Sequence, residues 1–304
     1  MTTTPTTTMP NIKTILVTGS SGQLGKSLKS IAYDYSNYEV MFAGRTQLDL
    51  SDKSSIDTFF NNHQFDLVIN CAAYTAVDKA ESEPELADKI NHLAVKQIAK
   101  IAKQQNTKVI HISTDYVFNG HSYRPYTETD EVSPQNVYGV SKLKGEQALL
   151  TILPSNAIII RTSWVYSEHG NNFVKTMLRL GQERDELNVV FDQLGTPTYA
   201  NDLASAIMKV VSSNAFNQTS FASDLYHYSN EGVCSWYDFA KTIFEYSNIQ
   251  CKVNPIETKC YPTPAVRPHY SLLNKGKIKN RSNLSIPYWK DSLQQCLNVL
   301  QEKA

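Results

Sequence analysis

The chain has 304 residues, of which 41% are hydrophobic and 19% charged, so it is long enough and apolar enough to fold around a core. Lysine plus arginine and aspartate plus glutamate balance at 29 each, so the chain lacks the overall basic charge typical of nucleic-acid-binding proteins. No apolar run approaches the roughly 20 residues that a membrane-spanning helix needs, and five cysteines without a Cys-x-x-Cys pair favour a reducing cytoplasm.

The chain begins with a threonine-rich segment. Met1 to Pro10 has neither the basic region nor the apolar region of a signal peptide. We therefore expect a disordered tail over residues 1–11, ahead of the first strand.

Apolar runs that favour strands alternate with helical patterns along the first half of the chain. Strands are expected at 15–17, 40–42, 67–69, 109–112 and 158–160, and helices at 24–32, 51–62 and 84–105. The strands are continuous apolar runs, which is typical of sheets that helices cover on both faces. The sequence therefore predicts an α/β fold with a doubly wound parallel sheet of the Rossmann type.

The last third of the chain has shorter elements and more proline, tyrosine and asparagine. We expect a dinucleotide-binding domain over residues 12–166 and a smaller, mixed α/β lobe, mainly for substrate, over residues 167–304. A helical pattern at about 198–211 could return to the first domain, so the boundary is soft.

A glycine-rich turn follows the first predicted strand and opens the first predicted helix. Of the 12 glycines in the chain, Gly19, Gly22 and Gly25 lie here. Such a turn lets backbone approach a pyrophosphate, and the helix N-terminus adds free N–H groups and a partial positive charge. Its place in a βαβ unit indicates dinucleotide binding; a tight turn that binds nothing is the alternative.

Residues after the next two strands bear on the choice of cofactor. Arg45 follows the second strand, where a basic residue accommodates the phosphate of NADP; a solvated surface arginine is the alternative. Asp49 could accept a hydrogen bond from the adenine amino group or begin a helix. Small residues after the third strand, from Asn70 to Thr75, let a flat ligand lie against backbone. We expect NADPH, with NADH as the alternative.

A tyrosine and a lysine four residues apart form the candidate catalytic pair. Tyr138 and Lys142 share one face of a helix because of their spacing. That helix is expected to begin at Ser133–Pro134 and to stop before Pro154. A nearby ammonium favours the phenolate and lowers the tyrosine pKa from about 10 toward working pH. Thr114, after the fourth strand, can hold a substrate carbonyl; a local turn is the alternative.

Four stretches of the sequence carry a family resemblance. They are Gly22–Gly25 in the form Gly-Gln-Leu-Gly, Asn70–Glu81, Ser113–Phe118, and Arg161–Tyr166 followed by Asn171–Phe173. With the catalytic pair, they resemble the extended short-chain dehydrogenase/reductase superfamily and, within it, the dTDP-4-dehydrorhamnose reductases. The resemblance spans nearly the whole chain after residue 11.

The resemblance implies a reaction of dTDP-rhamnose biosynthesis, the reduction of the 4-keto group of dTDP-4-dehydro-6-deoxy-L-mannose to dTDP-L-rhamnose. It implies that Tyr138 gives the proton, that Lys142 tunes Tyr138 and that Thr114 holds the oxygen. The cofactor site expected in this way comprises Gly19, Gly22, Gln23, Leu24, Gly25, Arg45, Asp49, Leu50, Ala73, Tyr74, Thr75, Tyr138 and Lys142. The expected substrate site comprises Thr114, Asp115, Val117, Phe118, Trp164, Asn172 and, toward the diphosphate, Arg267.

Some relatives dimerise through magnesium and place a glutamate just after the glycine turn. Lys26–Ser27 stand there in this chain, so we expect no structural metal, and a homodimer is left open. Two other functions remain: a non-catalytic regulatory subunit like that of methionine adenosyltransferase, and a sugar-nucleotide epimerase or dehydratase. The intact catalytic trio argues against the first, and Tyr116, where dehydratases tend to carry a glutamate, argues against the second.

Overall fold

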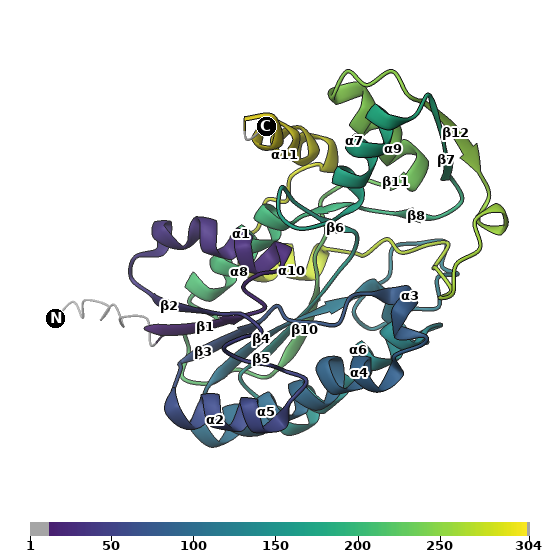
Figure 1. The fold of residues 1–304 in the computed structure, drawn as a ribbon. Helices are drawn as coiled ribbons and strands as arrows, with labels where there is room; N and C mark the ends of the chain where they lie inside the picture. The colour runs from purple at the N-terminus through teal and green to yellow at the C-terminus, as the bar shows by residue number, and fades with distance from the viewer. Residues whose placement is uncertain (1–11, 303–304) are drawn as a thin grey trace.

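The computed structural model describes residues 12–302, and the tail expected over residues 1–11 lies outside them. Its centre is a six-stranded parallel sheet in the order β10-β5-β4-β3-β1-β2 (Figure 1). The strands are β1 (Thr14–Thr18), β2 (Glu39–Ala43), β3 (Leu67–Asn70), β4 (Lys108–Thr114), β5 (Ala157–Thr162) and β10 (Asp224–His227). The predicted parallel sheet of the Rossmann type is confirmed.

The direction of winding reverses between β1 and β3. β2 lies on one side of β1, whereas β3, β4, β5 and β10 follow one another on the other side. In open α/β sheets, ligands bind outside the carboxyl ends of the strands at such a reversal. The glycine turn after β1 and the small residues after β3 therefore flank the expected binding crevice.

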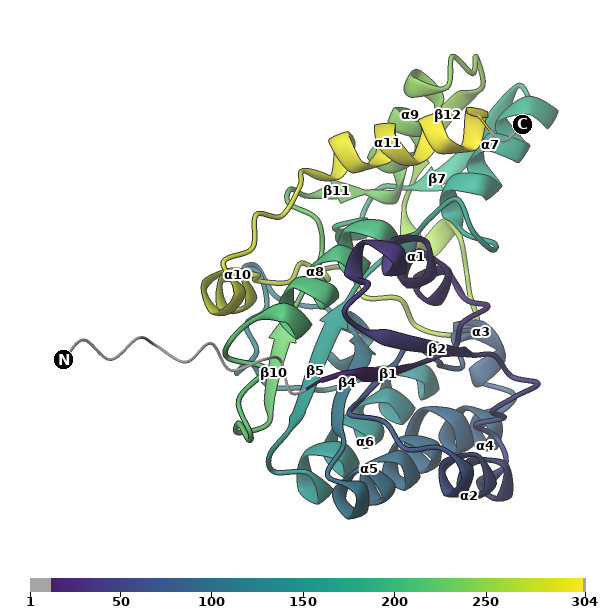
Figure 2. The ribbon, with the colours of Figure 1, turned by 90° about the vertical axis from the view of Figure 1, so that its left-hand side faces the viewer.

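Helices cover both faces of the sheet (Figures 1 and 2). One face carries α1 (Gln23–Ile31), α8 (Ala200–Ser212) and α10 (Gly276–Ser282), and the other carries α2 (Lys53–Asn62), α5 (Ala94–Gln105) and α6 (Val137–Ile152). Ile15 and Ile69 are buried toward the first set, and Leu16 and Val68 toward the second. Burial on both faces explains why the strands are continuous apolar runs.

A smaller lobe, at the top of Figure 1, contains three short strand pairs. These are β6 (Val165–Tyr166) with β9 (Thr198–Tyr199), β7 (Glu186–Val190) with β12 (Lys252–Ile256), and β8 (Leu194–Gly195) with β11 (Cys234–Ser235). Helices α7 (Phe173–Glu183), α9 (Trp236–Tyr246) and α11 (Trp289–Glu302) complete the lobe around a core of its own. The helix expected at 198–211 is α8, which shares a core with α1; the domain boundary itself stays a prediction.

Two elements differ from the sequence expectation. No apolar run predicts β10, because Asp224–His227 is short and half polar. The helix that carries the candidate catalytic pair begins at Val137, so the expected start at Ser133–Pro134 is wrong. The physical reason is the side chain of Asn136, which caps the helix by accepting a hydrogen bond from the Gly139 backbone nitrogen at 2.8 Å.

The helical stretch expected at 84–105 is interrupted by one π-helical turn. It consists of α4 (Pro84–Asp88), the turn Lys89–Leu93 and α5, and it follows the short helix α3 (Val77–Ala80). Within residues 12–302, no helix is both long and apolar enough to cross a membrane.

Candidate active site

A cleft of about 810 Å³ opens at the carboxyl ends of β1, β3, β4 and β5, against the smaller lobe. Sixteen residues expected from the sequence line it: Gly19, Gly22, Gln23, Leu24, Arg45, Asp49, Leu50, Ala73, Tyr74, Thr75, Thr114, Asp115, Tyr138, Lys142, Trp164 and Asn172. Gly25, Val117, Phe118 and Arg267 lie outside this lining. The fold therefore brings the glycine turn and the candidate catalytic trio to one cleft.

The glycine turn is shaped by close approaches between backbone segments. Gly19 has a φ of +67°, and a Cβ there would lie 2.7 Å from the backbone nitrogen of Ala72. A Cβ at Gly25 would lie 2.3 Å from the carbonyl oxygen of Gly19, so any side chain would push α1 off the turn. Gly25 thus serves packing, whereas Gly22, where a Cβ would meet the same oxygen at 3.2 Å, lies at the cleft.

The first turn of α1 suits an anion. Gly22 is its N-cap, and among residues 12–302 no side chain caps its amides and no acidic residue lies in the turn. Such a helix end offers free N–H groups and a partial positive charge to a pyrophosphate. At the cleft edge, the Arg45 side chain is 74% exposed and forms a weak ion pair with Asp49 at 3.4 Å, which a further phosphate could replace. The residues present fit a phosphorylated dinucleotide.

The candidate catalytic trio meets on the floor of the cleft. Tyr138 and Lys142 lie one turn apart on α6, and Thr114 ends β4. The Thr114 hydroxyl shares a hydrogen bond with the Tyr138 side chain and donates to Asp115 Oδ1 at 3.0 Å. The Lys142 amino group donates to the Ile112 carbonyl oxygen at 2.6 Å. A phenol, a hydroxyl and an amino group are thus available to one ligand.

Burial governs the proton equilibria of this trio. Burial raises the pKa of Tyr138 to about 12, although the hydrogen bond with Thr114 opposes the rise. Burial also lowers the pKa of Lys142 to about 8. The expected lowering of the Tyr138 pKa by Lys142 is therefore wrong. Desolvation of the phenol raises the pKa instead, and the Lys142 amino group is hydrogen-bonded to the Ile112 carbonyl oxygen of β4.

Asp115 contributes a buried carboxyl to the cleft wall. Its residue is 2% exposed, and burial raises its pKa to about 7 even though hydrogen bonds from Thr114 and Ser271 favour the carboxylate. Near neutral pH, both protonation states are accessible. Asp115 can therefore donate or accept a hydrogen bond toward a ligand hydroxyl.

The smaller lobe closes the cleft with an aromatic wall. Trp164 stacks on Trp236 with ring centroids 3.6 Å apart, and Phe173 packs on Trp236 at 4.7 Å. Trp164 has a φ of +49°, a left-handed conformation that is uncommon for a bulky residue. Sequence reasoning missed Trp236 and Phe173 as cleft residues; the capping box of Ser235 and Asp238 is the signal that marks the start of α9.

Gln23 and Asn172 face each other across the two lobes. The Asn172 amide nitrogen donates to Gln23 Oε1 at 2.9 Å and to the Ser167 carbonyl oxygen at 2.7 Å. The Asn172 amide oxygen caps α7 by accepting from the Lys175 backbone nitrogen at 3.1 Å. Both residues line the cleft, and both side chains also tie the glycine turn to the smaller lobe.

Three expected substrate residues are engaged elsewhere. Val117 and Phe118 are buried in a separate apolar cluster, where Phe118 stacks on Tyr126 at 4.1 Å. Arg267 pairs with Asp78 at 2.7 Å, so its guanidinium is held by a carboxylate. A contact of these three with a ligand stays a prediction.

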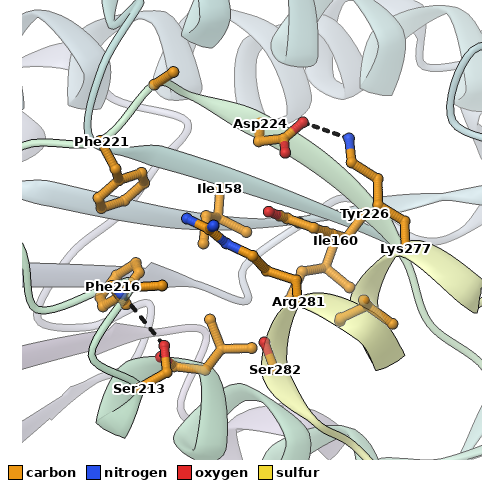
Figure 3. A pocket seen from close by; sticks show the side chains of 14 residues that line it. Ile158, Ile160, Ser213, Phe216, Phe221, Asp224, Tyr226, Lys277, Arg281 and Ser282 are labelled. Carbon is orange, nitrogen blue, oxygen red and sulfur yellow. Dashed lines mark hydrogen bonds and ion pairs between the residues drawn. The ribbon is translucent and has the colours of Figure 1, made fainter.

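A second cavity, of about 310 Å³, lies beside the edge strand β10 (Figure 3). Phe216, Phe221 and Tyr226 give it an aromatic lining, and Lys277 bonds to Asp224 at 2.5 Å at its side. Its lining contains none of the site residues expected from the sequence. The candidate chemistry therefore lies in the larger cleft.

Comparisons with known proteins agree on one family. The chain matches the model described as the RmlD substrate binding domain over residues 13–302. It is 41% identical to a dTDP-4-dehydrorhamnose reductase of Aggregatibacter actinomycetemcomitans, covering 92% of this chain and 97% of that protein. A crystal structure of a dTDP-4-dehydrorhamnose reductase from Clostridium acetobutylicum superposes with a TM-score of 0.88 at 42% identity, covering 95% of this chain and 99% of that one.

A Bacillus anthracis dTDP-4-dehydrorhamnose reductase, solved in complex with NADP, also superposes with a TM-score of 0.88. It is 37% identical, and the match covers 95% of this chain and 99% of that one. Similarity to these proteins extends over both lobes.

Proposed function

This chain belongs to the family described as the RmlD substrate binding domain, and from that premise we propose that it uses NADPH to reduce the 4-keto group of dTDP-4-dehydro-6-deoxy-L-mannose to dTDP-L-rhamnose. The observation that carries the proposal is the meeting of Thr114, Tyr138 and Lys142 in the cleft that also holds the glycine turn. A ketone reductase needs a nicotinamide beside a proton donor, and this cleft combines the two requirements. NADH is the alternative cofactor.

The glycine turn and the edge of the cleft hold the cofactor in this proposal. The amides at the start of α1 bind the pyrophosphate, and Arg45 binds the phosphate that distinguishes NADP from NAD. Asp49 holds Arg45 at 3.4 Å in the structure, so the arginine must exchange that weak, exposed pair for the phosphate. The support for NADPH is the basic residue after β2 together with the relative solved with NADP.

Tyr138 is the proton donor in this proposal. When bound, the reduced nicotinamide supplies a hydride to the carbonyl carbon, and the oxygen then needs one proton. A phenol whose pKa is about 12 stays protonated at neutral pH, and an alkoxide is a base strong enough to take its proton. Thr114 orients the phenol, and its hydroxyl, once it turns from Asp115 Oδ1, donates to the same oxygen.

The smaller lobe positions the sugar nucleotide. Asp115 and the aromatic pair Trp164 and Trp236 present a carboxyl and two ring faces to the cleft. Hexose rings pack their C–H faces on aromatic side chains, and carboxyls bond sugar hydroxyls. These roles are part of the proposal.

The rival functions fit the cleft less well. A regulatory subunit needs no proton donor beside a nucleotide turn, yet Tyr138 and Thr114 are bonded together there. A dehydratase needs a further acid next to Asp115, where Tyr116 stands with a pKa that burial raises. Simple reduction requires no more than the groups present.

The test uses purified protein, NADPH and the 4-keto sugar nucleotide made in situ by the upstream enzymes. Loss of the reduced-nicotinamide absorbance with an equal amount of dTDP-rhamnose supports the proposal. Binding of NADPH without its oxidation contradicts it and favours a regulatory subunit.

We also propose that the protein is located in the cytoplasm and forms a homodimer. Cys71, Cys234, Cys251 and Cys260 form no disulfide in the part of the chain that the structure describes, which supports the cytoplasm as its location. A homodimer is proposed on family resemblance alone. Sedimentation of the purified protein at micromolar concentration measures it, and a single monomeric species would contradict it.

A further inference from the structure

Three polar side chains stand in one row of the sheet, where apolar residues are the rule. Thr18, Asn70 and His111 are in-register neighbours on β1, β3 and β4, and each is at most 1% exposed. The row ends at Lys142 of α6, whose Nζ lies 3.4 Å from His111 Nε2. A buried polar group lowers the stability of the fold unless it has hydrogen-bond partners. Which atom donates and which accepts along this row is therefore important.

The orientation of the Asn70 amide, with its oxygen toward Thr18 and its nitrogen toward His111, sets the direction of the hydrogen bonds along the row. The Ala72 backbone N–H can only donate, and it donates to Thr18 Oγ1 at 3.3 Å. The Thr18 hydroxyl then donates to Asn70 Oδ1 at 2.6 Å. The Asn70 amide nitrogen faces His111 Nδ1 at 3.0 Å and donates to it.

This order selects one tautomer of His111. Burial holds the pKa of His111 well below its usual range, so the ring is neutral. Because Nδ1 accepts a hydrogen bond, the single ring hydrogen is on Nε2. That hydrogen points at the amino group of Lys142.

Other titratable groups near Lys142 have partners of their own or are neutral, although the charge of Glu146 favours the ammonium. Glu146, one turn further along α6, forms two hydrogen bonds with Arg161 of β5, at 2.9 and 2.6 Å. The thiol of Cys71, after β3, is neutral at physiological pH because burial raises its pKa to about 12. Tyr138, one turn earlier on α6, is neutral as well. His111 is therefore the neighbour whose hydrogen bonding distinguishes the amine of Lys142 from the ammonium.

We propose that His111 is a positioning residue for Lys142: the row of Thr18 and Asn70 keeps a hydrogen on His111 Nε2, which directs the amino group toward Ile112 and the cleft and disfavours its protonation. An amine nitrogen can accept from Nε2–H, whereas an ammonium meets it donor to donor. The geometry thus favours ready exchange of a proton at Lys142. This inference rests on the proposed reduction, in which Lys142 stands beside the proton donor.

The first test compares the pH dependence of kcat for His111 variants. His111→Asn keeps an acceptor near Nδ1 for Asn70 and removes the donor that faces Lys142. Lys142, with a pKa of about 8, is the group whose deprotonation we assign to the alkaline limb of kcat. The ammonium is less disfavoured in the variant, so this limb moves to higher pH by about half a unit to one unit. The affinity of His111→Asn for NADPH stays close to that of the parent. In His111→Gln the side-chain amide reaches the Nε2 position, so the alkaline limb of kcat returns to the pH of the parent.

A matched control is His227→Asn. His227 is equally buried and neutral, bonds through Nδ1 to the Tyr126 carbonyl oxygen at 3.1 Å, and lies on β10, two strands away from β4. We expect the alkaline limb of kcat in His227→Asn to stay at the pH of the parent. If His111→Asn lowers kcat equally at every pH, or if the control shifts the limb as much, the inference is overturned.

A second measurement does not depend on turnover or on the stability of the variants. Nitrogen-15 NMR of histidine-labelled wild-type protein reports which ring nitrogen of His111 carries hydrogen. We expect hydrogen on Nε2 and a bare Nδ1 at neutral pH; hydrogen on Nδ1, or a charged ring, overturns the inference. Thr18→Val, which removes the hydroxyl that orders the row, gives a mixture of tautomers if the inference holds and an unchanged spectrum if it does not.

The two proposals fail in different ways. If wild-type protein reduces no 4-keto sugar nucleotide, the proposed function fails while the tautomer measurement still stands. If wild-type protein turns over and the limb of His111→Asn does not move, the inference about His111 fails and the reductase remains.

Discussion

At the scale of single residues, Tyr138 is the group on which the proposed proton transfer depends. Its phenol is buried, bonded to Thr114, and protonated at neutral pH. We expect Tyr138→Phe to lower kcat by about 10² or more, because a positioned general acid contributes on that order. The affinity for NADPH, measured by fluorescence titration, should change little.

Tyr116→Phe is the matched control for that variant. The Tyr116 ring lies edge-on to Tyr138 at 5.5 Å and lines the same cleft, but its hydroxyl has no proposed part in the proton transfer. We expect it to keep most of the parent's activity. Near-parental turnover in Tyr138→Phe, or an equal loss in both variants, would remove Tyr138 from its role.

Asp115 makes stability depend on pH. Its pKa is about 7 in the folded protein and about 3.9 in an unfolded chain, so the folded state binds more protons between these values. The free energy of unfolding therefore falls as the pH rises from about 4 to about 7. Asp115→Asn removes this loss, so urea denaturation at about pH 8 should show a gain over the parent on the order of a few kcal/mol.

The gain of Asp115→Asn should vanish at about pH 4, where the parent carboxyl is protonated in both states. An equal difference between the two proteins at both pH values would show that burial of the charge is not its cause.

At the scale of elements, Gly22 and Gly25 of the glycine turn have different roles, which substitutions can separate. A Cβ at Gly25 would meet the Gly19 carbonyl oxygen at 2.3 Å, so Gly25→Ala should disturb the packing of α1 and lower both Tm and NADPH affinity. A Cβ at Gly22 would meet that oxygen at 3.2 Å, a contact that a small shift relieves. Gly22→Ala should keep a Tm near that of the parent and weaken NADPH binding by about tenfold or more.

Thermal unfolding with and without NADPH measures both variants. The cofactor raises the Tm of the parent by binding the folded state. If Gly22→Ala gains as much from the cofactor as the parent does, Gly22 does not face the pyrophosphate.

Elements whose hydrophobic pattern follows from local burial could be predicted from the sequence. Ile158–Ile160 are apolar because helices cover both faces of β5, and the five strands of this kind are found where the pattern places them. β10 was not predicted, because an edge strand has fewer buried positions and therefore fewer apolar residues. The start of α6 was misplaced because Ser133–Pro134 and Asn136 both suit a helix N-terminus, and the side-chain bond of Asn136 decides between them.

At the scale of the whole molecule, the cleft lies between two lobes, and its residues could be predicted from the sequence better in one lobe than in the other. Residues at the carboxyl ends of the strands were predictable because topology brings all such ends to one edge. Trp236 was not, because the path of the smaller lobe depends on long-range contacts that no local pattern shows. The engagement of Arg267 with Asp78 has the same origin, since the two lie far apart in sequence.

The bond between Asn172 and Gln23 links those lobes. Asn172→Asp keeps the acceptor that caps α7 but cannot donate to Gln23 or to the Ser167 carbonyl oxygen. We expect a Tm lower by a few degrees and higher KM values for both substrates, because the glycine turn and the smaller lobe are no longer tied.

Asn172→Ser, which keeps a cap and loses the tie without adding a charge, should behave alike. Unchanged KM values in both variants would show that the tie does not shape the cleft.

The transfer of hydride from the nicotinamide to C4 of the sugar tests the account most directly. The protein is incubated with NADPH deuterated at nicotinamide C4 and with dTDP-4-dehydro-6-deoxy-L-mannose, and the product is examined by mass spectrometry and proton NMR. We predict dTDP-L-rhamnose with a single deuterium at C4, and about a hundredth of this product or less from Tyr138→Phe on the same time scale. Product without deuterium when both C4 positions of the cofactor are labelled, or no product from active, NADPH-binding protein, would contradict it.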